Sequence, residues 1–348
     1  MRCRESDRIM KTGKRKPTIY DIATASAASP TTVSMVLNGH WKKHRIKPET
    51  AALVLRCAGE LGYSVNQKAR GLRLARSGLA GMIVPHYRNR FFAGLAEAFE
   101  AEARERDLCP IVVSTQRDPQ IETRIVETLL AQQVEFLFIA GVRDPSPLND
   151  MCTAAGIRCI NVDLPGPKAP SVISDNYAAA AHVTELVIEK LLSSDLPIDD
   201  WFFFGGVRDD NSTRERIGGF NAVLAKHGVR LGEEAFRCEG YPPHIAERAL
   251  ADRYERNGRL PAGLFVNGIT GLEGAASFLG RLPRETWNST RIAAFDWDPF
   301  AAQMPYDITM IRQDVEAMIS ASFGLMDTYP EDIPLITIPA RLVAPVEP

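Results

Sequence analysis

The strongest constraint on the fold is a set of short apolar runs that alternate with helical segments from Leu79 onward. The first four runs are GLAGMIVP, CPIVVST, VEFLFIAG and RCINVD, and the pattern restarts after Asp175 with WFFFGG, residues 232–238, GLFVNG and RIAAFDW. Strands and helices that alternate at these lengths predict parallel sheets with helices on both faces. Two such sets in tandem predict an α/β core of two doubly wound lobes with a cleft between them, where ligands bind at the carboxyl ends of the strands.

The helices of this core are expected where apolar residues recur at helical spacing. They cover residues 92–106, 121–132, 149–155, 178–192, 212–227, 246–257 and 271–279. An Asp at the end of a strand is often only the N-cap of the next helix, and we expect Asp175 to have this role.

Ahead of the core, residues 18–39 read TIYDIATASAASPTTVSMVLNG and predict two short helices joined by a tight turn. Thr18 is the candidate N-cap of the first helix, and Ser29 is the candidate N-cap of the second. Pro30 then takes the first helical position, where a missing N–H costs nothing.

The second of these helices is expected to present a polar, uncharged face. Its buried side follows the spacing i, i+3, i+4 and consists of Val33, Val36 and Leu37. The residues left facing outward are Thr31, Thr32, Ser34, Met35 and Asn38. Such a face amid basic flanks favours a DNA-reading helix-turn-helix. A small helical hairpin in any soluble protein is the alternative.

A third helix is expected from Pro48 and ends at Gly62. Its apolar stripe consists of Ala51, Val54, Leu55, Ala58 and Leu61. Residues 65–77, VNQKARGLRLARS, follow as a basic linker, and residues 1–16 are a basic lead without periodicity that we expect to be disordered.

Charge is distributed unevenly along the chain. Residues 1–77 contain 16 Lys and Arg against 5 Asp and Glu, whereas the rest contains 25 against 38. A basic head on an acidic body predicts a polyanionic partner for the head alone.

The six cysteines are scattered without the paired spacing of zinc ligands or of a disulfide framework. No apolar run approaches the ~18 residues that span a bilayer, and the N-terminus has no apolar signal-peptide core. We therefore expect a cytoplasmic protein with no membrane association, no metal and no cofactor.

Five segments, in this order and spacing, resemble the lactose-repressor (LacI/GalR) family of transcription regulators: TIYDIA, SPTTVSMVLNG, IKPET, ELGYSVNQKARGLR and GLAGMIVP. The resemblance covers the chain from Pro17 onward. The segments TTVSMVLNG, GLRLARSGLAGMIVP, RDPQIETRIVETLLAQQVE and RIAAFDWDPF are most similar to the fructose-repressor branch, also called the catabolite repressor/activator.

The resemblance implies a helix-turn-helix head over 17–64, a hinge over 65–77 and a periplasmic-binding-protein-like core over 78–348. It also implies that the chain crosses between the lobes near Ser174, Arg312 and Leu335. Lobe one is then expected over 78–173 and 312–334, and lobe two over 174–311 and 335–348.

The resemblance further implies operator contacts in the head and the hinge. These are Thr18, Tyr20, Pro30, Thr31, Thr32, Ser34, Met35, Asn38, Arg45, Asn66, Ala69, Leu72 and Arg73. Leu72 matches the family's leucine wedge, which unstacks a base step in the minor groove; an ordinary linker leucine is the alternative. Met35 stands where many members carry Arg, which favours a thymine-methyl contact over bidentate recognition of guanine.

Effector contacts are implied at strand ends of the core. They are Tyr87, Arg90, Phe91, Asp163, Arg216, Asp296 and Gln313. Carboxylates accept hydrogen bonds from vicinal hydroxyls, an Arg fork donates to ring oxygens or phosphate, and an aromatic ring covers the apolar face of a sugar. The alternatives are an Asp that only caps a helix and an Arg216 that pairs on the surface with Glu215 or Asp209.

Two departures from the family pattern bear on the ligand. Gly268-Ile269 replaces a usual Asn-Asp pair, which removes a polar contact, and Leu164 stands where Arg commonly follows Asp163. The segment HYRNR, with Arg88 and Arg90 ahead of a helix N-terminus, favours a phosphorylated sugar such as fructose 1-phosphate.

Together these features predict a sequence-specific DNA-binding regulator, a repressor of carbohydrate genes. A homodimer is expected to bind a pseudopalindromic operator, gated by a sugar or sugar phosphate between the lobes. An enzyme is one alternative, but the chain has no G-x-S-x-G elbow, no Walker A loop and no G-x-G-x-x-G after a strand. A cytoplasmic sugar receptor is the other, and the basic head argues against it.

Overall fold

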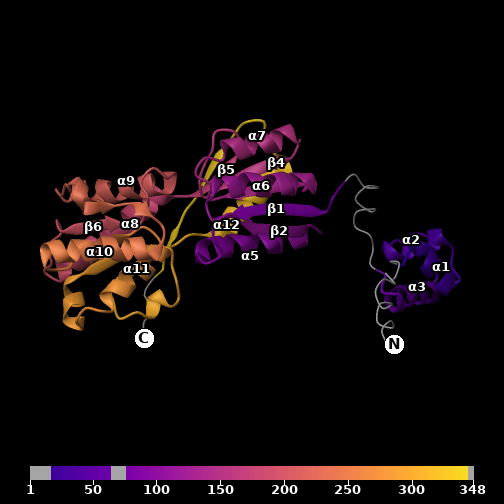
Figure 1. Ribbon diagram of the computed structural model, residues 1–348, viewed down its shortest axis with the longest axis horizontal. Coiled ribbons are helices and arrows are strands. Elements are labelled where there is room, and N and C mark those ends of the chain that lie inside the picture. The colour runs from indigo at the N-terminus through magenta and orange to yellow at the C-terminus, as the bar shows by residue number, and fades with distance from the viewer. Residues whose placement is uncertain (1–16, 64–75, 344–348) are drawn as a thin grey trace, which may run out of the picture. The chain divides into compact units, whose positions relative to one another are not determined.

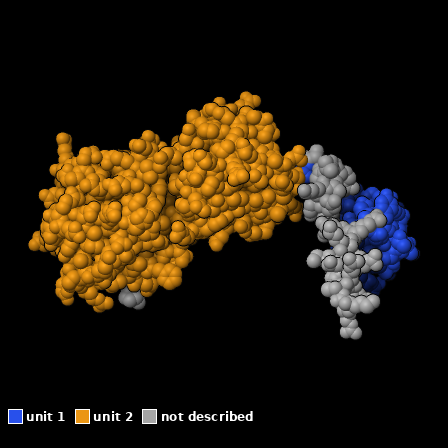
Figure 2. All heavy atoms as spheres, viewed as in Figure 1, with its two compact units in different colours: residues 1–76 blue, residues 77–348 orange. Residues whose placement is uncertain are grey.

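The computed structural model describes residues 17–63 and 76–343. The predicted lead and all but the last two residues of the predicted hinge therefore lie outside the described residues. The chain divides into two compact units, residues 1–76 and residues 77–348 (Figure 2).

The first unit is a head of three short helices, α1 (Ile19–Ser26), α2 (Pro30–Leu37) and α3 (Pro48–Glu60) (Figure 1). The backbone N–H of Thr18 donates to the Asp21 carboxylate at 2.6 Å and so starts α1. The Ser29 hydroxyl accepts from the N–H of Thr32 at 3.1 Å and starts α2. Both predicted N-caps are confirmed.

A small apolar core joins the three helices. It includes Ile22, Val33, Val36, Ala51, Val54, Cys57 and Ala58. Two predicted members of the α3 stripe are wrong, because Leu55 remains 51% exposed and Leu61 remains 41% exposed. Leu55 follows Val54 by one residue, about 100° around the helix, so its side chain turns away from the core. Leu61 lies beyond the last residue of α3.

The second unit begins with a six-stranded parallel sheet in the order β13-β5-β4-β3-β1-β2. Its strands are β1 (Leu79–Val84), β2 (Cys109–Ser114), β3 (Phe136–Ala140), β4 (Arg158–Val162), β5 (Ser171–Ser174) and β13 (Leu335–Ile338). The helices that pack on one face are α5 (Arg90–Glu105) and α12 (Val315–Thr328). Those on the other face are α6 (Pro119–Ala131) and α7 (Ser146–Ala154). This is lobe one.

Lobe two is a second six-stranded sheet in the order β14-β12-β11-β10-β6-β8. Its strands are β6 (Trp201–Phe204), β8 (Phe236–Arg237), β10 (Gly263–Val266), β11 (Arg291–Phe295), β12 (Ile308–Arg312) and β14 (Arg341–Val343). Only β14 pairs antiparallel with its neighbour. One face carries α8 (Asn176–Ser193) and α9 (Asn211–Lys226), and the other carries α10 (Pro243–Asn257) and α11 (Ile269–Leu279). A two-stranded ribbon pairs β7 (Gly206–Val207) with β9 (Glu239–Gly240).

The predicted fold class is confirmed, with a helical head followed by two doubly wound lobes. The chain passes between the lobes after β5, after β12 and after β13. The predicted crossing near Leu335 is therefore about one strand too early, since 335–338 pairs with β5 in lobe one and only β14 joins lobe two. This strand is short and half-exposed, so its sequence does not indicate which sheet it joins.

Two further expectations need correction. Residues 232–238 do not form one strand, because Glu233–Ala235 is a 3-10 turn and only Phe236–Arg237 pairs with β6. The predicted elements also do not include α12, whose buried residues lie on lobe one. No helix among the described residues is long and apolar enough to cross a bilayer.

Candidate DNA-reading face and effector site

The outward side of α2 is uncharged, as the sequence predicts. Thr31 is exposed, and Ser34 and Met35 are partly exposed. Asn38 follows the helix, and its side-chain amide donates to the carbonyl oxygen of Ser34 at 2.6 Å. The backbone N–H of Asn38 donates to the same oxygen at 3.1 Å, so the backbone and the side chain of Asn38 together close the C-terminal end of α2.

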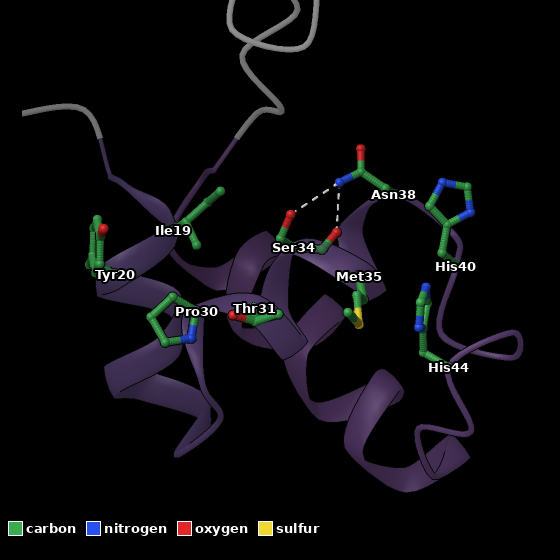
Figure 3. Close-up of a pocket in the computed structure, with 9 residues that line it drawn as sticks. All are labelled: Ile19, Tyr20, Pro30, Thr31, Ser34, Met35, Asn38, His40 and His44. Atoms are coloured by element: carbon green, nitrogen blue, oxygen red, sulfur yellow. Dashed lines mark hydrogen bonds between the residues drawn. The ribbon is translucent and has the colours of Figure 1, made fainter. Parts of the chain in front are cut away.

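A hollow lies on this side of the head (Figure 3). Helix α2 contributes Pro30, Thr31, Ser34 and Met35 to its lining. Helix α1 contributes Ile19 and Tyr20, and the segment after α2 contributes Asn38, His40 and His44. Tyr20 is 71% exposed, so its ring is available to a partner.

Four exposed cations occupy the turn between α2 and α3, namely Lys42, Lys43, Arg45 and Lys47. Arg45 has a left-handed backbone, with φ of 54°. Lys and Arg at the edge of a reading helix are suited to phosphate contacts, which position a protein on DNA without reading its sequence.

In the core, two buried aspartates follow corresponding strands. Asp163 comes directly after β4 and Asp296 directly after β11, and each of these strands is third in the order of its sheet. Their φ angles are 74° and 68°, in the left-handed region that residues other than glycine rarely adopt. Backbone strain of this kind concentrates at functional sites, because surrounding structure must maintain it.

Arg216 of α9 lies near both aspartates. Its Nε donates to the side-chain oxygen of Asn176 at 2.8 Å, and one Nη donates to the backbone oxygen of Asn267 at 2.7 Å. The guanidinium carbon lies 3.6 Å from the centre of the Phe295 ring. The alternative of a surface pair with Glu215 or Asp209 is wrong, because Arg216 is only 5% exposed.

The sequence R-x-x-G-F explains how α9 brings Arg216 so close to α8. A Cβ at Gly219 would lie 2.1 Å from the carbonyl oxygen of Tyr177, so only glycine allows the two helices to approach. Phe220 then enters the core of lobe two. Asn176, which binds Arg216, opens α8 next to Asp175, and Asp175 accepts from the N–H of Ala178 as the predicted cap.

Asp163 is 6% exposed, and no hydrogen bond to its carboxylate occurs among the described residues. Burial raises the pKa of this carboxyl to about 6, although Arg117 and Arg216 lie close enough to oppose the rise. A buried carboxylate without a donor is costly. Asp163 is thus ready to accept hydrogen bonds from a ligand.

Asp296 has partners of its own. Gln313 donates from Nε2 to Asp296 at 2.6 Å and accepts from the hydroxyl of Ser174 at 2.6 Å. This chain links the end of β5 in lobe one to the end of β11 in lobe two. The backbone N–H of Ile269 also approaches Asp296, at 3.4 Å.

A second buried carboxylate bridges the two lobes. Asp210 of lobe two accepts from Nε of Arg143 at 2.8 Å and from the Tyr241 hydroxyl at 2.5 Å. Arg117 of lobe one lies 3.9 Å from the same carboxylate and 4.2 Å from the centre of the Tyr241 ring. We call Asp210, Arg143, Arg117 and Tyr241 the lobe bridge.

Comparisons with known proteins decide the family. Residues 80–310 match the periplasmic binding protein domain, and residues 18–66 match the bacterial regulatory proteins of the lacI family. The chain is 42% identical to the ribitol operon repressor of Klebsiella aerogenes over 194 residues, which cover 56% of this chain and 72% of that protein. The chain belongs to the LacI family.

This LacI-family protein is accordingly a DNA-binding transcriptional regulator. It is also 26% identical to the fructose operon regulatory protein of Vibrio cholerae over 315 residues, which cover 88% of this chain and 92% of that protein. The structure of the lac repressor dimer bound to operator has the same fold, with a TM-score of 0.78 at 19% identity over 95% of this chain and 98% of that one. The relatives named here are regulators of operons rather than enzymes.

The structure brings four of the seven predicted effector residues together, namely Asp163, Arg216, Asp296 and Gln313. The other three have different partners. The Tyr87 hydroxyl donates to the carbonyl of Val112 on the edge strand β2 at 2.7 Å. Phe91 is buried in the core of lobe one. Arg90 pairs with Asp298 and lies over the ring of Phe300.

Sequence reasoning missed the lobe bridge and the two asparagines that bind Arg216. Arg143 and Asp210 are 67 residues apart in the chain, and Arg216 and Asn267 are 51 apart. No local pattern signals such pairs. The only available signal was the position of Asp210 and Asn267 after strands of lobe two, in the segments GGVRDD and FVNG.

Of the predicted operator contacts, Asn66, Ala69, Leu72 and Arg73 lie outside the described residues. Cys57, Cys109, Cys152, Cys159 and Cys238 are free thiols. Among the residues that the structure describes, no group of three or more His, Cys, Asp or Glu is placed to hold a metal ion.

Proposed function

We propose that this LacI-family regulator binds a polyhydroxylated effector at Asp163, Arg216 and Asp296, and that occupancy of this site sets its affinity for the operator. The effector class includes sugars, sugar alcohols and sugar phosphates. The relatives named for ribitol and fructose operons support a ligand of this class.

The observation that carries the proposal is the buried, unpartnered carboxylate of Asp163. A ligand with vicinal hydroxyls supplies the donors that this carboxylate lacks. Arg216 still has one Nη without a hydrogen-bond partner among the described residues, and this group can donate to a ring oxygen, a hydroxyl or a phosphate. Asp296, fixed by Gln313, completes a set of two acceptors and one donor.

The ligand is proposed to change the equilibrium between lobe arrangements. The Asp296–Gln313–Ser174 chain and the lobe bridge both cross from one lobe to the other. A ligand that binds one arrangement more tightly shifts the equilibrium toward it by the ratio of the two affinities. We propose that this shift reaches the operator through a homodimer on a pseudopalindromic site in the cytoplasm, as in the lac repressor dimer bound to operator. We propose no catalytic role.

A sugar phosphate is one of the effectors that we propose. Arg90 is engaged by Asp298, which takes one of the two arginines of HYRNR away from an anion site. His86 lies close enough to Arg117 and Arg88 that, together with burial, these two arginines lower its pKa. We expect Arg88→Ala to weaken a sugar phosphate and to leave the free sugar unchanged.

The test is a thermal-shift screen of the intact protein against free sugars, pentitols and sugar phosphates, followed by calorimetry on each hit. A ligand that binds only the folded state raises the melting temperature. Asp163→Asn should weaken the hit by at least about thirtyfold, since a charged acceptor is replaced and a hydrogen bond to a charge is worth about 2 kcal/mol. Asp195→Asn is the matched control, because Asp195 also has positive φ but is exposed.

Equal affinities for the native protein and Asp163→Asn would contradict the site assignment. A hit that binds but leaves operator affinity unchanged in a titration would separate ligand binding from regulation. In that case the core would be a receptor without a gating role.

A further inference from the structure

Helix α2 carries no charged residue, and this restricts how the head can read bases. Its eight residues are PTTVSMVL. Guanine is read best by Arg or Lys, cytosine by Asp or Glu, and adenine by Asn or Gln. None of these six residue types occurs in α2, and its only side-chain hydrogen-bonding groups are the hydroxyls of its Ser and Thr residues, which can bond to more than one base. Asn38 follows the helix, and its amide nitrogen donates to Ser34, which engages the donor half of the donor–acceptor pair that reads adenine.

The side chains that α2 does present are suited to an apolar group. Figure 3 shows Met35 and Thr31 next to each other on the lining of the hollow, with Pro30 on the side of α1 and His44 on the side of the turn. The side chain of Met35 has no polar hydrogen to offer, and Thr31 carries a methyl group beside its hydroxyl. In the major groove, the only apolar group that a base pair presents is the 5-methyl of thymine.

The surroundings of the hollow fit the edge of a DNA duplex. The exposed cations Lys42, Lys43, Arg45 and Lys47 lie in the turn that also contributes His40 and His44 to the lining. These cations complement phosphates, whereas the hollow itself is lined by uncharged residues and the two histidines. An apolar surface beside cations matches a methyl group flanked by a phosphate backbone.

We propose that this hollow receives the 5-methyl group of thymine, so that each operator half-site has a thymine at the base pair that faces Met35 and Thr31. This inference rests on the assignment of the head as a DNA-binding domain. Specificity at that base pair then comes from burial of one methyl group rather than from bidentate hydrogen bonds. Burying one methyl is worth a factor of about four in affinity.

The experiment begins with selection of binding sites by the full chain from a library of random duplexes. The best duplex is then synthesised again with single thymines replaced in turn by deoxyuridine, which removes only the methyl group. We expect one or two positions in each half-site to lose about three- to fivefold in affinity, and the other positions to change by less than about 1.5-fold. Cytosine and 5-methylcytosine at the sensitive position should differ in the same direction.

Variants connect the methyl group to the hollow. Met35→Ala should bind the thymine and deoxyuridine duplexes equally, at about the affinity of the native protein for deoxyuridine. Met35→Leu retains an apolar side chain and should keep the discrimination. Leu55→Ala is the control, because it also truncates an exposed apolar side chain of the head but lies on α3, outside the hollow.

The possible outcomes distinguish a failure of the thymine proposal from a failure of the assignment of the head as a DNA-binding domain. If no duplex is enriched, the assignment of the head fails, and this proposal fails with it. If a duplex is enriched but deoxyuridine is tolerated at every position, the head binds DNA and the thymine proposal is overturned. Discrimination that persists in Met35→Ala, or a guanine required at the sensitive pair, overturns it as well. The deoxyuridine series uses the native protein, so the test does not depend on the folding of any variant.

Discussion

The head and the core of this regulator present opposite chemistry to their ligands. On the head, α2 offers uncharged side chains at the surface, and its side-chain hydrogen bonds join near neighbours such as Ser29 with Thr32 and Asn38 with Ser34. In the core, Asp163, Arg216 and Asp296 are each less than a tenth exposed, and the partners of Arg216 are distant in sequence. An uncharged surface costs little free energy when it is empty, whereas buried charges depend on every partner. Binding to the head should therefore be modular, and binding to the core should be coupled to stability and pH.

The strongest test of this difference between head and core is to unfold the head alone. Val33 is fully buried in the small head core, so Val33→Asp places an unpaired carboxylate there. The cost of several kcal/mol is comparable to the whole stability of a small domain. We expect operator binding to be lost by more than about a hundredfold, while effector binding by calorimetry stays unchanged. Leu55→Asp, on the exposed side of α3, should retain operator binding.

A change of effector affinity in Val33→Asp would contradict the modular view. It would mean that the folding of the head is coupled to effector binding by the core.

The next largest effect is expected for Arg216→Ala. This change removes a buried cation that lies close to Asp163 and Asp296 and leaves Asn176 and Asn267 without its donors. We expect effector affinity to fall about a hundredfold and the core to lose about 3 kcal/mol of stability. Calorimetry and thermal unfolding measure the two effects. Arg214→Ala is the matched control, because Arg214 lies on the same helix but is exposed.

If Arg216→Ala weakens the effector without lowering the melting temperature, the guanidinium contacts the ligand but does not stabilise the empty site. That result would weaken the contrast between the two regions.

The same contrast explains what the sequence can predict. The head was predictable down to its caps, because Thr18, Ser29 and Pro30 act on residues within one helical turn. Within the core, the ends of parallel strands were recognisable, and these ends place Asp163, Asp296 and Gln313 correctly at the meeting point of the lobes.

The sequence does not indicate which side chain each of these site residues contacts. Arg90 and Asp163 both follow strands of lobe one, yet Arg90 pairs with Asp298 while Asp163 has no donor. Phe91 looked suited to cover a sugar but is buried in the core of lobe one, because it lies on the side of α5 that faces the sheet. Asp210 directly precedes α9, and only the packing of the two lobes brings Arg143 to it.

A smaller change, of about tenfold in effector affinity, is expected when the pH is varied. The pKa of Asp163 is raised from its ordinary 3.8 to about 6, so the folded core holds a proton that the unfolded chain has lost between these values. This raised pKa stabilises the empty core below pH 4, and the contribution disappears as pH rises to about 6. A ligand hydroxyl donates best to the ionised carboxylate, so effector affinity should rise about tenfold from pH 5 to pH 7. Asp163→Asn should flatten this part of the profile. A profile that keeps its slope in Asp163→Asn would assign the titration to another group.

The smallest effect is expected at the lobe bridge, which combines a buried carboxylate with an exposed arginine. The Asp210 side chain is fully buried, but that of Arg143 is 60% exposed, so solvent screens their interaction. We expect Arg143→Ala to weaken the effector two- to fivefold, and 0.5 M salt to produce a similar loss in the native protein but little further loss in the variant. Arg208→Ala is the control, since Arg208 pairs with Glu233 within lobe two. Tyr241→Phe should couple to Arg143→Ala in a double-mutant cycle, because both residues bind the same carboxylate. A loss larger than that of Arg216→Ala would reverse the order of these effects, and it would mean that closure of the lobes, rather than the buried charges, determines effector affinity.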